Sequence, residues 1–223
     1  MLGEVFDPQR DWLDEQGTRP HWAQAGTVVF ITFGAADAIP RAVLELWDRE
    51  KQEWLARRGF IGPEHWSTRL RAVPPDVREA FRREFARKRE RELDGCGGAC
   101  VLKRPELAEV VAEALCHFDG DRYHLSDYVV MPNHVHLLAT FPKPEAMRDQ
   151  CDSWLHYTAV RINKALERKG RFWRPEPFDH LVRSPEQLVA LRRYIDPAGV
   201  YSDTVESQVE LRIFASPAAG GAK

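Results

Sequence analysis

Two histidines separated by one residue lie in the middle of an otherwise apolar run. Residues 129–138 read Val-Val-Met-Pro-Asn-His-Val-His-Leu-Leu, and the histidines are His134 and His136. Successive side chains of a β-strand point to opposite faces, so both imidazoles would share one face while Val135 and Leu137 point toward a core. Two imidazoles on one face are a natural pair of metal ligands. A bare His-x-His pair also occurs on exposed sheet faces, but two polar rings in the middle of an apolar strand favour a metal site.

Basic residues gather in a second segment, residues 148–174. It carries more than twice as many basic as acidic side chains, which makes it the best candidate for contacts with nucleic-acid phosphates. The aromatic pair Phe172 and Trp173 lies near its end, and these rings would either stack on unpaired bases or pack in the core. The candidate DNA-binding residues are Arg161, Lys164, Arg168, Arg171, Trp173 and Arg183.

The elements that would position these residues follow from hydrophobic periodicity and from start and stop signals. Asp76 is the expected cap of a charged helix, and Gly170 is the expected stop of the longest helix. Ser184, Pro185 and Gln187 form a complete helix start, because serine caps, proline suits the first position and glutamine completes a capping box. We expect strands at residues 27–33, 123–131 and 134–141, and helices at residues 40–58, 76–93, 105–118, 144–169 and 185–196.

The order of these elements predicts the fold class. Short strands separated by longer helices, with a hairpin in the middle, indicate an α+β sandwich in which helices cover one face of an antiparallel sheet. The chain of 223 residues is long enough for one such domain with extensions.

Composition restricts the partners only weakly. The net charge is −2, which by itself argues against a nucleic-acid partner, but phosphate contacts require a basic face and not a basic chain. The sequence has no run of about 18 apolar residues and no secretory signal pattern at its start, so we expect a cytoplasmic protein without a membrane partner. The cysteines would then be reduced thiols. Cys96 and Cys100 lack a second cysteine pair, so a small-residue loop is favoured over a structural zinc site.

The central motif resembles that of a known family. Met-Pro-Asn-His-Val-His-Leu-Leu at residues 131–138 is similar to the histidine-hydrophobic-histidine motif of the single-tyrosine HUH transposases, and the flanking sequence narrows the resemblance to the REP-associated tyrosine transposases. It extends over about residues 26–200. The matching stretches are residues 28–33, 115–140, 154–163, 172–173, 178–183 and 193–195.

This resemblance implies a ferredoxin-like core and a DNA-cleaving activity. His134 and His136 would hold a divalent metal, magnesium or manganese, that polarises the scissile phosphate of single-stranded or hairpin DNA. A tyrosine would attack the phosphorus, form a 5′-phosphotyrosine link and release a 3′-hydroxyl. Because the covalent link keeps the energy of the phosphodiester, rejoining would need no ATP.

The resemblance places the nucleophile on the last helix, at Tyr194. By helical geometry this residue lies about 60° from Leu191, at the edge of the buried stripe, which suits a side chain that must reach out of the core. Tyr157, in the middle of the preceding long helix, is the second candidate. Either residue could instead be a boundary tyrosine that packs its ring and exposes its hydroxyl.

The sequence departs from the family after Tyr194. The family carries an amide side chain four residues later as a third metal ligand, and that position is Ala198, which cannot coordinate a metal. Asp196 stands where an asparagine is expected. It is the candidate third ligand if the helix unwinds before Pro197.

Two other functions stay open. A domesticated module that binds hairpin DNA but has lost cleavage would account for the altered residues after Tyr194. A histidine-triad nucleotide hydrolase would need a third alternating histidine, but Leu138 occupies that position.

The resemblance also suggests a division of the chain. We expect an N-terminal extension at residues 1–25, a catalytic domain at residues 26–205 with a charged helical insertion at about residues 60–100, and a tail at residues 206–223. Related elements include monomers and dimers, so a monomer and a homodimer are both open.

Overall fold

A computed structural model describes residues 3–16 and 20–195 of the chain. The chain divides into two compact units. The sheet unit comprises the described part of residues 1–36 and 101–223, and the helical unit comprises residues 37–100.

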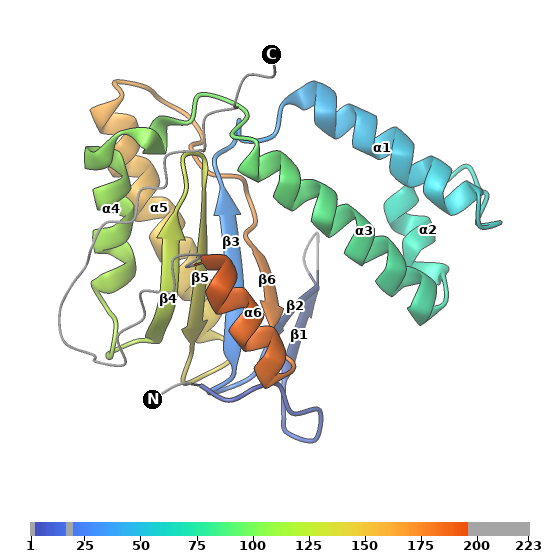
Figure 1. The fold of residues 1–223 in the computed structure, drawn as a ribbon, viewed down its shortest axis with the longest axis horizontal. Helices are drawn as coiled ribbons and strands as arrows, with labels where there is room; N and C mark the ends of the chain where they lie inside the picture. Colours follow the sequence, from blue (N-terminus) through green and yellow to red (C-terminus); the bar gives the residue numbers. More distant parts are fainter. Residues whose placement is uncertain (1–2, 17–19, 196–223) are drawn as a thin grey trace, which may run out of the picture. The chain divides into compact units, whose positions relative to one another are not determined.

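The sheet unit is built on four antiparallel strands in the order β4-β5-β3-β6 (Figure 1). Helix α4 precedes β4 in the chain, and helix α5 lies between β5 and β6, which makes the βαββαβ pattern of a ferredoxin-like fold. The predicted α+β class is therefore confirmed. The bounds are β3 (Val28–Gly34), α4 (Pro105–Cys116), β4 (His124–Val130), β5 (His134–Thr140), α5 (Ala146–Ala165) and β6 (Phe178–Leu181).

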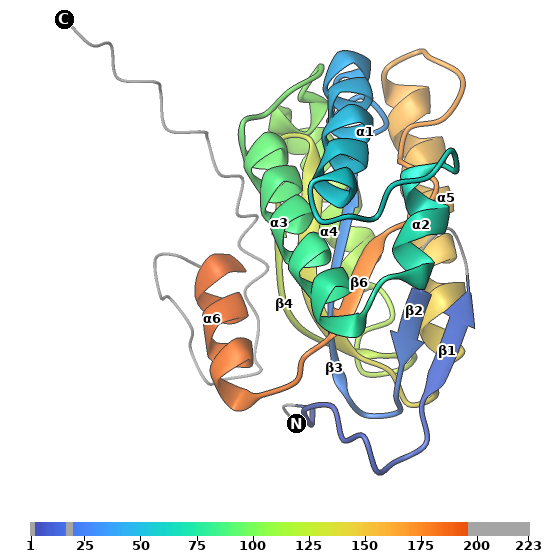
Figure 2. The same ribbon diagram turned by 90° about the vertical axis from the view of Figure 1, so that its right-hand side faces the viewer.

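The two faces of the sheet bury different residues because the strands alternate. Ile31 and Leu137 belong to the larger core, which α4 and α5 cover. Phe30 and Leu138 point to the other face, which helix α6 (Pro185–Ile195) covers with Leu188, Leu191 and Ile195. Figures 1 and 2 show α6 on the side of the sheet away from α5. Helices α4 and α5 cover one face of the sheet, as expected, whereas α6 covers the other face.

Local signals in the sequence predicted the end of α5 and the start of α6. The predicted stop at Gly170 is wrong for α5, because the helix ends at Ala165 with Leu166 as its C-cap and Glu167 already has a φ of 51°. Gly170 has a φ of 99° in the connection that follows, which a glycine adopts without steric cost. At the start of α6, Ser184 Oγ accepts a hydrogen bond from Gln187 N at 3.2 Å, so the predicted cap is confirmed. The side chain of Gln187 accepts from Arg183 N at 2.8 Å, one residue earlier than in a standard capping box.

Four elements of the sheet unit were not predicted. They are the two-stranded sheet of β1 (Leu13–Gln16) and β2 (Pro20–Ala23), the short 3-10 helix η1 (Val101–Lys103), and β6, the fourth strand of the main sheet, whose segment was expected to be a connection between helices. The sequence does not predict the β1–β2 hairpin, because its mostly polar residues lack the apolar alternation of a core strand.

The helical unit has its own small core. Helices α1 (Arg41–Ala56), α2 (Trp66–Ala72) and α3 (Pro75–Asp94) bury Trp54, Leu55, Phe81 and Phe85 among them. The predicted cap at Asp76 is wrong. Pro74 is the N-cap and Pro75 opens the helix, since its fixed φ suits the first turn, so Asp76 lies within that turn.

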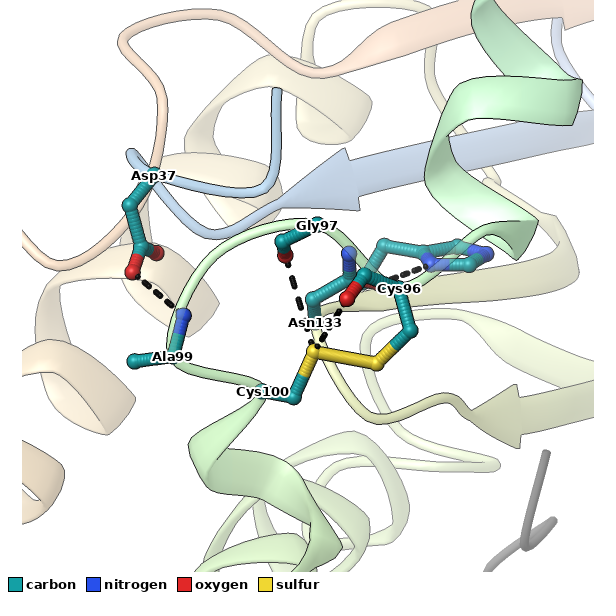
Figure 3. The surroundings of a disulfide bond; sticks show 7 residues. Asp37, Cys96, Gly97, Ala99, Cys100 and Asn133 are labelled. Carbon is teal, nitrogen blue, oxygen red and sulfur yellow. Dashed lines mark hydrogen bonds between the residues drawn. A yellow bond between two sulfur atoms is a disulfide. The ribbon is translucent and has the colours of Figure 1, made fainter. Parts of the chain in front are cut away.

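Cys96 and Cys100 close a short loop at the end of the helical unit. They are joined by a disulfide, which corrects the expectation of reduced thiols at these positions (Figure 3). Cys96, Gly98 and Cys100 all have positive φ values, so the backbone coils tightly enough to bring the two cysteine Cα atoms to 6.3 Å. The carboxylate of Asp37 accepts a hydrogen bond from Ala99 N at 2.9 Å and ties the loop to the start of the unit.

Candidate metal and nucleophile site

The two histidines of the central motif lie on β5, as the alternation predicts. Their side chains are 0% and 1% exposed and point to the face that α6 covers. The register pairs His134 with Gly34 and His136 with Thr32 of β3. Both rings therefore lie at the same end of the sheet, beside the end of β3.

Each imidazole is held by a polar partner on its Nδ1 atom. His134 Nδ1 lies 2.7 Å from Asn133 Oδ1, and His136 Nδ1 lies 2.7 Å from Thr32 Oγ1. The ring of Phe30 stacks on His136 with centroids 5.3 Å apart. Contacts of this kind fix ring orientation and tautomer, and they are typical around histidines that bind metals.

The Nε2 atoms of the two rings face one another at 2.9 Å. If each Nδ1 atom donates to its oxygen partner, each neutral ring presents an Nε2 lone pair to the same point. Two lone pairs that converge repel one another unless a proton or a metal ion lies between them. The histidine pair thus has the chemistry of a cation site, and the donor set fits a divalent metal.

The hydroxyl of Tyr194 also lies beside this histidine pair. Its Oη atom lies 3.2 Å from His136 Nε2, and its ring centroid lies 5.1 Å from that of His136. Tyr194 comes from α6 and is 39% exposed, so its hydroxyl is at the border between the buried histidines and solvent. The fold therefore brings together His134, His136 and Tyr194.

Tyr157, the second candidate nucleophile, is not brought to the histidines. It lies on α5, which covers the other face of the sheet, and it is 44% exposed on the outer side of that helix. Arg161 donates a hydrogen bond to its hydroxyl at 3.3 Å. The remaining candidate ligand, Asp196, lies outside the described residues, as does Ala198.

Most of the basic candidates are exposed. Arg161 and Lys164 lie on the outer side of α5, and Arg171 and Arg183 lie in connections that flank β6. Arg168 is only half-buried, and its guanidinium donates to Asn163 at 2.9 Å and lies over the ring of Phe172.

The connection between α5 and β6 runs past the end of the sheet that carries His134. Arg174 N donates to Gly34 O at 2.9 Å, and Ala36 N donates to Phe172 O at 2.7 Å. Because Gly34 is paired with His134, the basic connection lies at the same end of the sheet as the histidine pair.

Trp173 is a core residue, which corrects its prediction as a base-stacking side chain. It is 3% exposed and packs edge-on against Phe33. Its indole N–H donates to Thr158 Oγ1 at 2.7 Å, and that hydroxyl donates to Trp154 O at 2.6 Å. Phe172 is equally buried, so neither ring is available to a base in this structure.

Two residues around the site, Thr32 and Asn133, were missed from the sequence. Thr32 read as one more β-branched residue of a strand, and Asn133 read as a turn residue between strands. His180 of β6 is paired with Phe30, so it too lies on the α6 side of the sheet. The signal that could have identified Thr32 is its place as a polar residue inside a fully buried strand.

Within the described residues, no helix combines the length and apolarity needed to cross a membrane.

Comparisons with known proteins identify one similar solved structure and no family. No protein-family model matches the chain, and no curated protein matches it. The solved structure, titled "Structure of the REP associates tyrosine transposase bound to a REP hairpin", is 14% identical and has a TM-score of 0.37; the match covers 82% of this chain and 70% of that chain. A TM-score this low carries no functional conclusion.

Proposed function

We propose that this chain is a metal-dependent enzyme that cleaves and rejoins single-stranded DNA through a covalent link to Tyr194. The observation that carries the proposal is the convergence of one hydroxyl and two imidazoles: Tyr194 Oη lies 3.2 Å from His136 Nε2, which lies 2.9 Å from His134 Nε2. A nucleophile within hydrogen-bond reach of a second catalytic group is the expected arrangement for covalent catalysis.

The histidine pair is the proposed site for magnesium or manganese. A divalent metal bound there would polarise the scissile phosphate and lower the cost of negative charge in the transition state. The residues of this chain contribute the rest. Asn133 and Thr32 hold the two rings, and Phe30 packs against His136.

In the proposed reaction the Tyr194 oxygen attacks phosphorus. A new bond forms between phosphorus and the tyrosine oxygen, and the bond from phosphorus to the 3′-oxygen breaks. The leaving 3′-oxygen takes up a proton from water and becomes a 3′-hydroxyl. The tyrosine hydroxyl gives up its proton to water, because Tyr194 is 39% exposed and the Nε2 lone pair of His136 would be held by the metal. Rejoining is the reverse attack by a 3′-hydroxyl on the phosphotyrosine.

The exposed cations are the proposed contacts to the DNA backbone. Arg171 is the best placed, because its connection lies at the end of the sheet where His134 lies. Arg161, Lys164, Arg168 and Arg183 stay in the proposal as phosphate contacts, since sequence-independent binding comes from such cations.

A covalent adduct tests the proposal. The protein is incubated with manganese and a single-stranded DNA that carries a hairpin, and the products are separated on a denaturing gel. We expect a DNA adduct that Tyr194→Phe abolishes and that the matched Tyr157→Phe variant leaves intact. An adduct that survives Tyr194→Phe would contradict the assignment of the nucleophile.

A native gel shift with the hairpin DNA and an assay of nucleotide hydrolysis without DNA separate the other two functions. Hairpin binding without any adduct would favour a binding module that has lost cleavage. Hydrolysis of free nucleotides would favour a histidine-triad enzyme, but Leu138 at the third position is fully buried under α6 and has no nucleophilic atom.

A further inference from the structure

Helix α6 presents two polar side chains on opposite flanks of its apolar stripe. Leu188, Leu191 and Ile195 pack on the sheet. At 100° per residue, Arg192 lies about 70° to one side of the middle of this stripe, and Tyr194 lies about 90° to the other side. The two flanks reach different strands, because Arg192 contacts β4 and Tyr194 contacts β5.

Arg192 reaches a buried carboxylate on β4. Its Nε atom lies 3.3 Å from Asp127 Oδ2 and 3.4 Å from Oδ1, and the Asp127 side chain is 0% exposed. Ser126 Oγ donates to Asp127 Oδ2 at 2.6 Å. An aspartate this deeply buried is costly unless it is paired, so its position depends on Arg192 and Ser126.

A β-bulge is what turns Asp127 toward α6. The pairing of β4 with β5 shifts between Leu125 and Asp127, so Ser126 is the extra residue and Asp127 pairs with Leu138. Leu138 is on the α6 face of the sheet, so Asp127 is on that face as well. Bulges commonly redirect a side chain in this way.

The apolar stripe alone would fix the rotation of α6 about its own axis only loosely. Apolar contacts have no preferred direction, whereas a buried charge pair requires one geometry. A roll of the helix that lifts Arg192 away from Asp127 would also move Tyr194 relative to His136, because the two side chains lie on opposite flanks of one rigid helix.

We propose that the Asp127–Arg192 pair is a positioning device that holds the Tyr194 hydroxyl beside the His134–His136 pair. Neither residue touches the reacting atoms, so both act through α6. The expected effect on cleavage rests on the proposed function. The expected effect on the position of Tyr194 rests only on the geometry of α6.

The position of Tyr194 can be measured without any cleavage. The protein is labelled with 3-fluorotyrosine, and the Tyr194 resonance is assigned by its loss in Tyr194→Phe. Manganese bound at the histidines broadens nearby fluorine signals with a steep dependence on distance. We expect strong broadening at Tyr194 in the wild type and clearly weaker broadening in Asp127→Asn and Arg192→Gln, with manganese affinity unchanged.

Cleavage kinetics give the second measurement. In single turnovers, both variants should form the adduct about 10- to 100-fold more slowly, with DNA affinity unchanged, because a small misplacement of a nucleophile has an effect of this size. Arg192→Lys keeps the charge and should recover part of the rate. Glu50→Gln, which breaks the Lys88–Glu50 ion pair of the helical unit, is the matched control and should change neither measurement.

The possible outcomes are distinct. If the variants lose thermal stability but keep wild-type broadening and a wild-type rate per folded molecule, the pair is only structural and the proposal is overturned. A wild-type Tyr194 signal that manganese leaves sharp overturns it as well. Broadening that depends on Asp127 in a protein that forms no adduct supports the positioning role while the proposed cleavage fails.

Discussion

At the scale of single residues, the oxygen atoms that contact the imidazole rings matter for the metal site as much as the histidines themselves. Thr32 Oγ1 and Asn133 Oδ1 each lie 2.7 Å from an Nδ1 atom, so both Nε2 atoms are directed to one point. Removal of such a partner usually weakens metal binding because the ring loses its orientation.

The first prediction concerns Thr32. Thr32→Val keeps the shape of the side chain but removes the oxygen beside His136 Nδ1, so manganese affinity should fall by about 10- to 100-fold. Calorimetric titration measures the affinity. Unchanged binding would show that Thr32 does not orient His136.

Thr158 is the matched control for Thr32, because it is another buried threonine in the same unit. Thr158→Val removes the acceptor of the Trp173 indole N–H and should cost about 1 to 3 kcal/mol of unfolding free energy. Denaturant unfolding measures this cost. Manganese affinity should stay at the wild-type value, and a parallel loss of affinity would mean that general destabilisation explains both variants.

A pH-dependent prediction concerns Cys151. Burial raises the pKa of its thiol far above the ordinary value, and the negative charge of Asp179 raises this pKa further. In the unfolded chain the thiol loses its proton near pH 8.5, whereas in the folded protein it keeps the proton. The unfolding free energy should therefore be constant below about pH 8 and fall as the pH rises above about 8.5.

Urea unfolding at neutral and at alkaline pH measures this decline. Cys151→Ala removes the titrating thiol and should flatten that part of the profile. A wild-type profile that stays flat above pH 9 would contradict the assignment of the pKa shift to Cys151.

At the scale of elements, the short helix α6 decides whether Tyr194 meets the histidines. Its start is held by Ser184, whose hydroxyl accepts from Gln187 N. Its inner side is held by three apolar residues on the sheet and by the Asp127–Arg192 pair. A helix of 11 residues is marginal alone, so these contacts maintain it.

Loss of the cap should loosen α6 selectively. Ser184→Ala should cost about 1 kcal/mol and speed amide hydrogen exchange in α6 about fivefold. Exchange followed by mass spectrometry measures this effect. Ser67→Ala in α2 is the control and should leave α6 unchanged, and an equal rise in exchange throughout the sheet would contradict a local role for Ser184.

At the scale of the whole molecule, the described residues divide into two compact units, and the helical unit has a core of its own. The helical unit is inserted in the sequence between β3 and η1, and its compact region begins at Asp37. We therefore extend the proposed insertion from residues 60–100 to residues 37–100. The extensions at residues 1–25 and 206–223 stay proposals.

Separate cores should unfold separately. We expect two calorimetric transitions, of which manganese raises only that of the sheet unit, because a ligand stabilises the unit that binds it. Phe81→Ala, in the core of the helical unit, should lower only the other transition. A single transition that both changes shift would contradict independent cores.

The sequence by itself determined the local features of this protein. The alternation around His134 and His136 predicted that both rings share one face, and the periodic stripes predicted α1, α3, α4, α5 and α6. Helix α2, the β1–β2 hairpin and β6 were missed because they are short, with four to seven residues each, and α2 has no buried residue. The sequence left the role of Trp173 open, because an aromatic residue in a basic segment looks the same in the sequence whether it packs in a core or lies on a binding surface.

Only the tertiary structure decided which residues meet. Thr32 and Tyr194 lie 104 and 58 residues from His136 in the chain, and both reach its ring. The strand order β4-β5-β3-β6 places Thr32 there, and the packing of α6 on the free face of the sheet places Tyr194 there. The physical reason is that periodicity determines which face of an element is apolar, whereas contacts between distant elements depend on how those faces pack together.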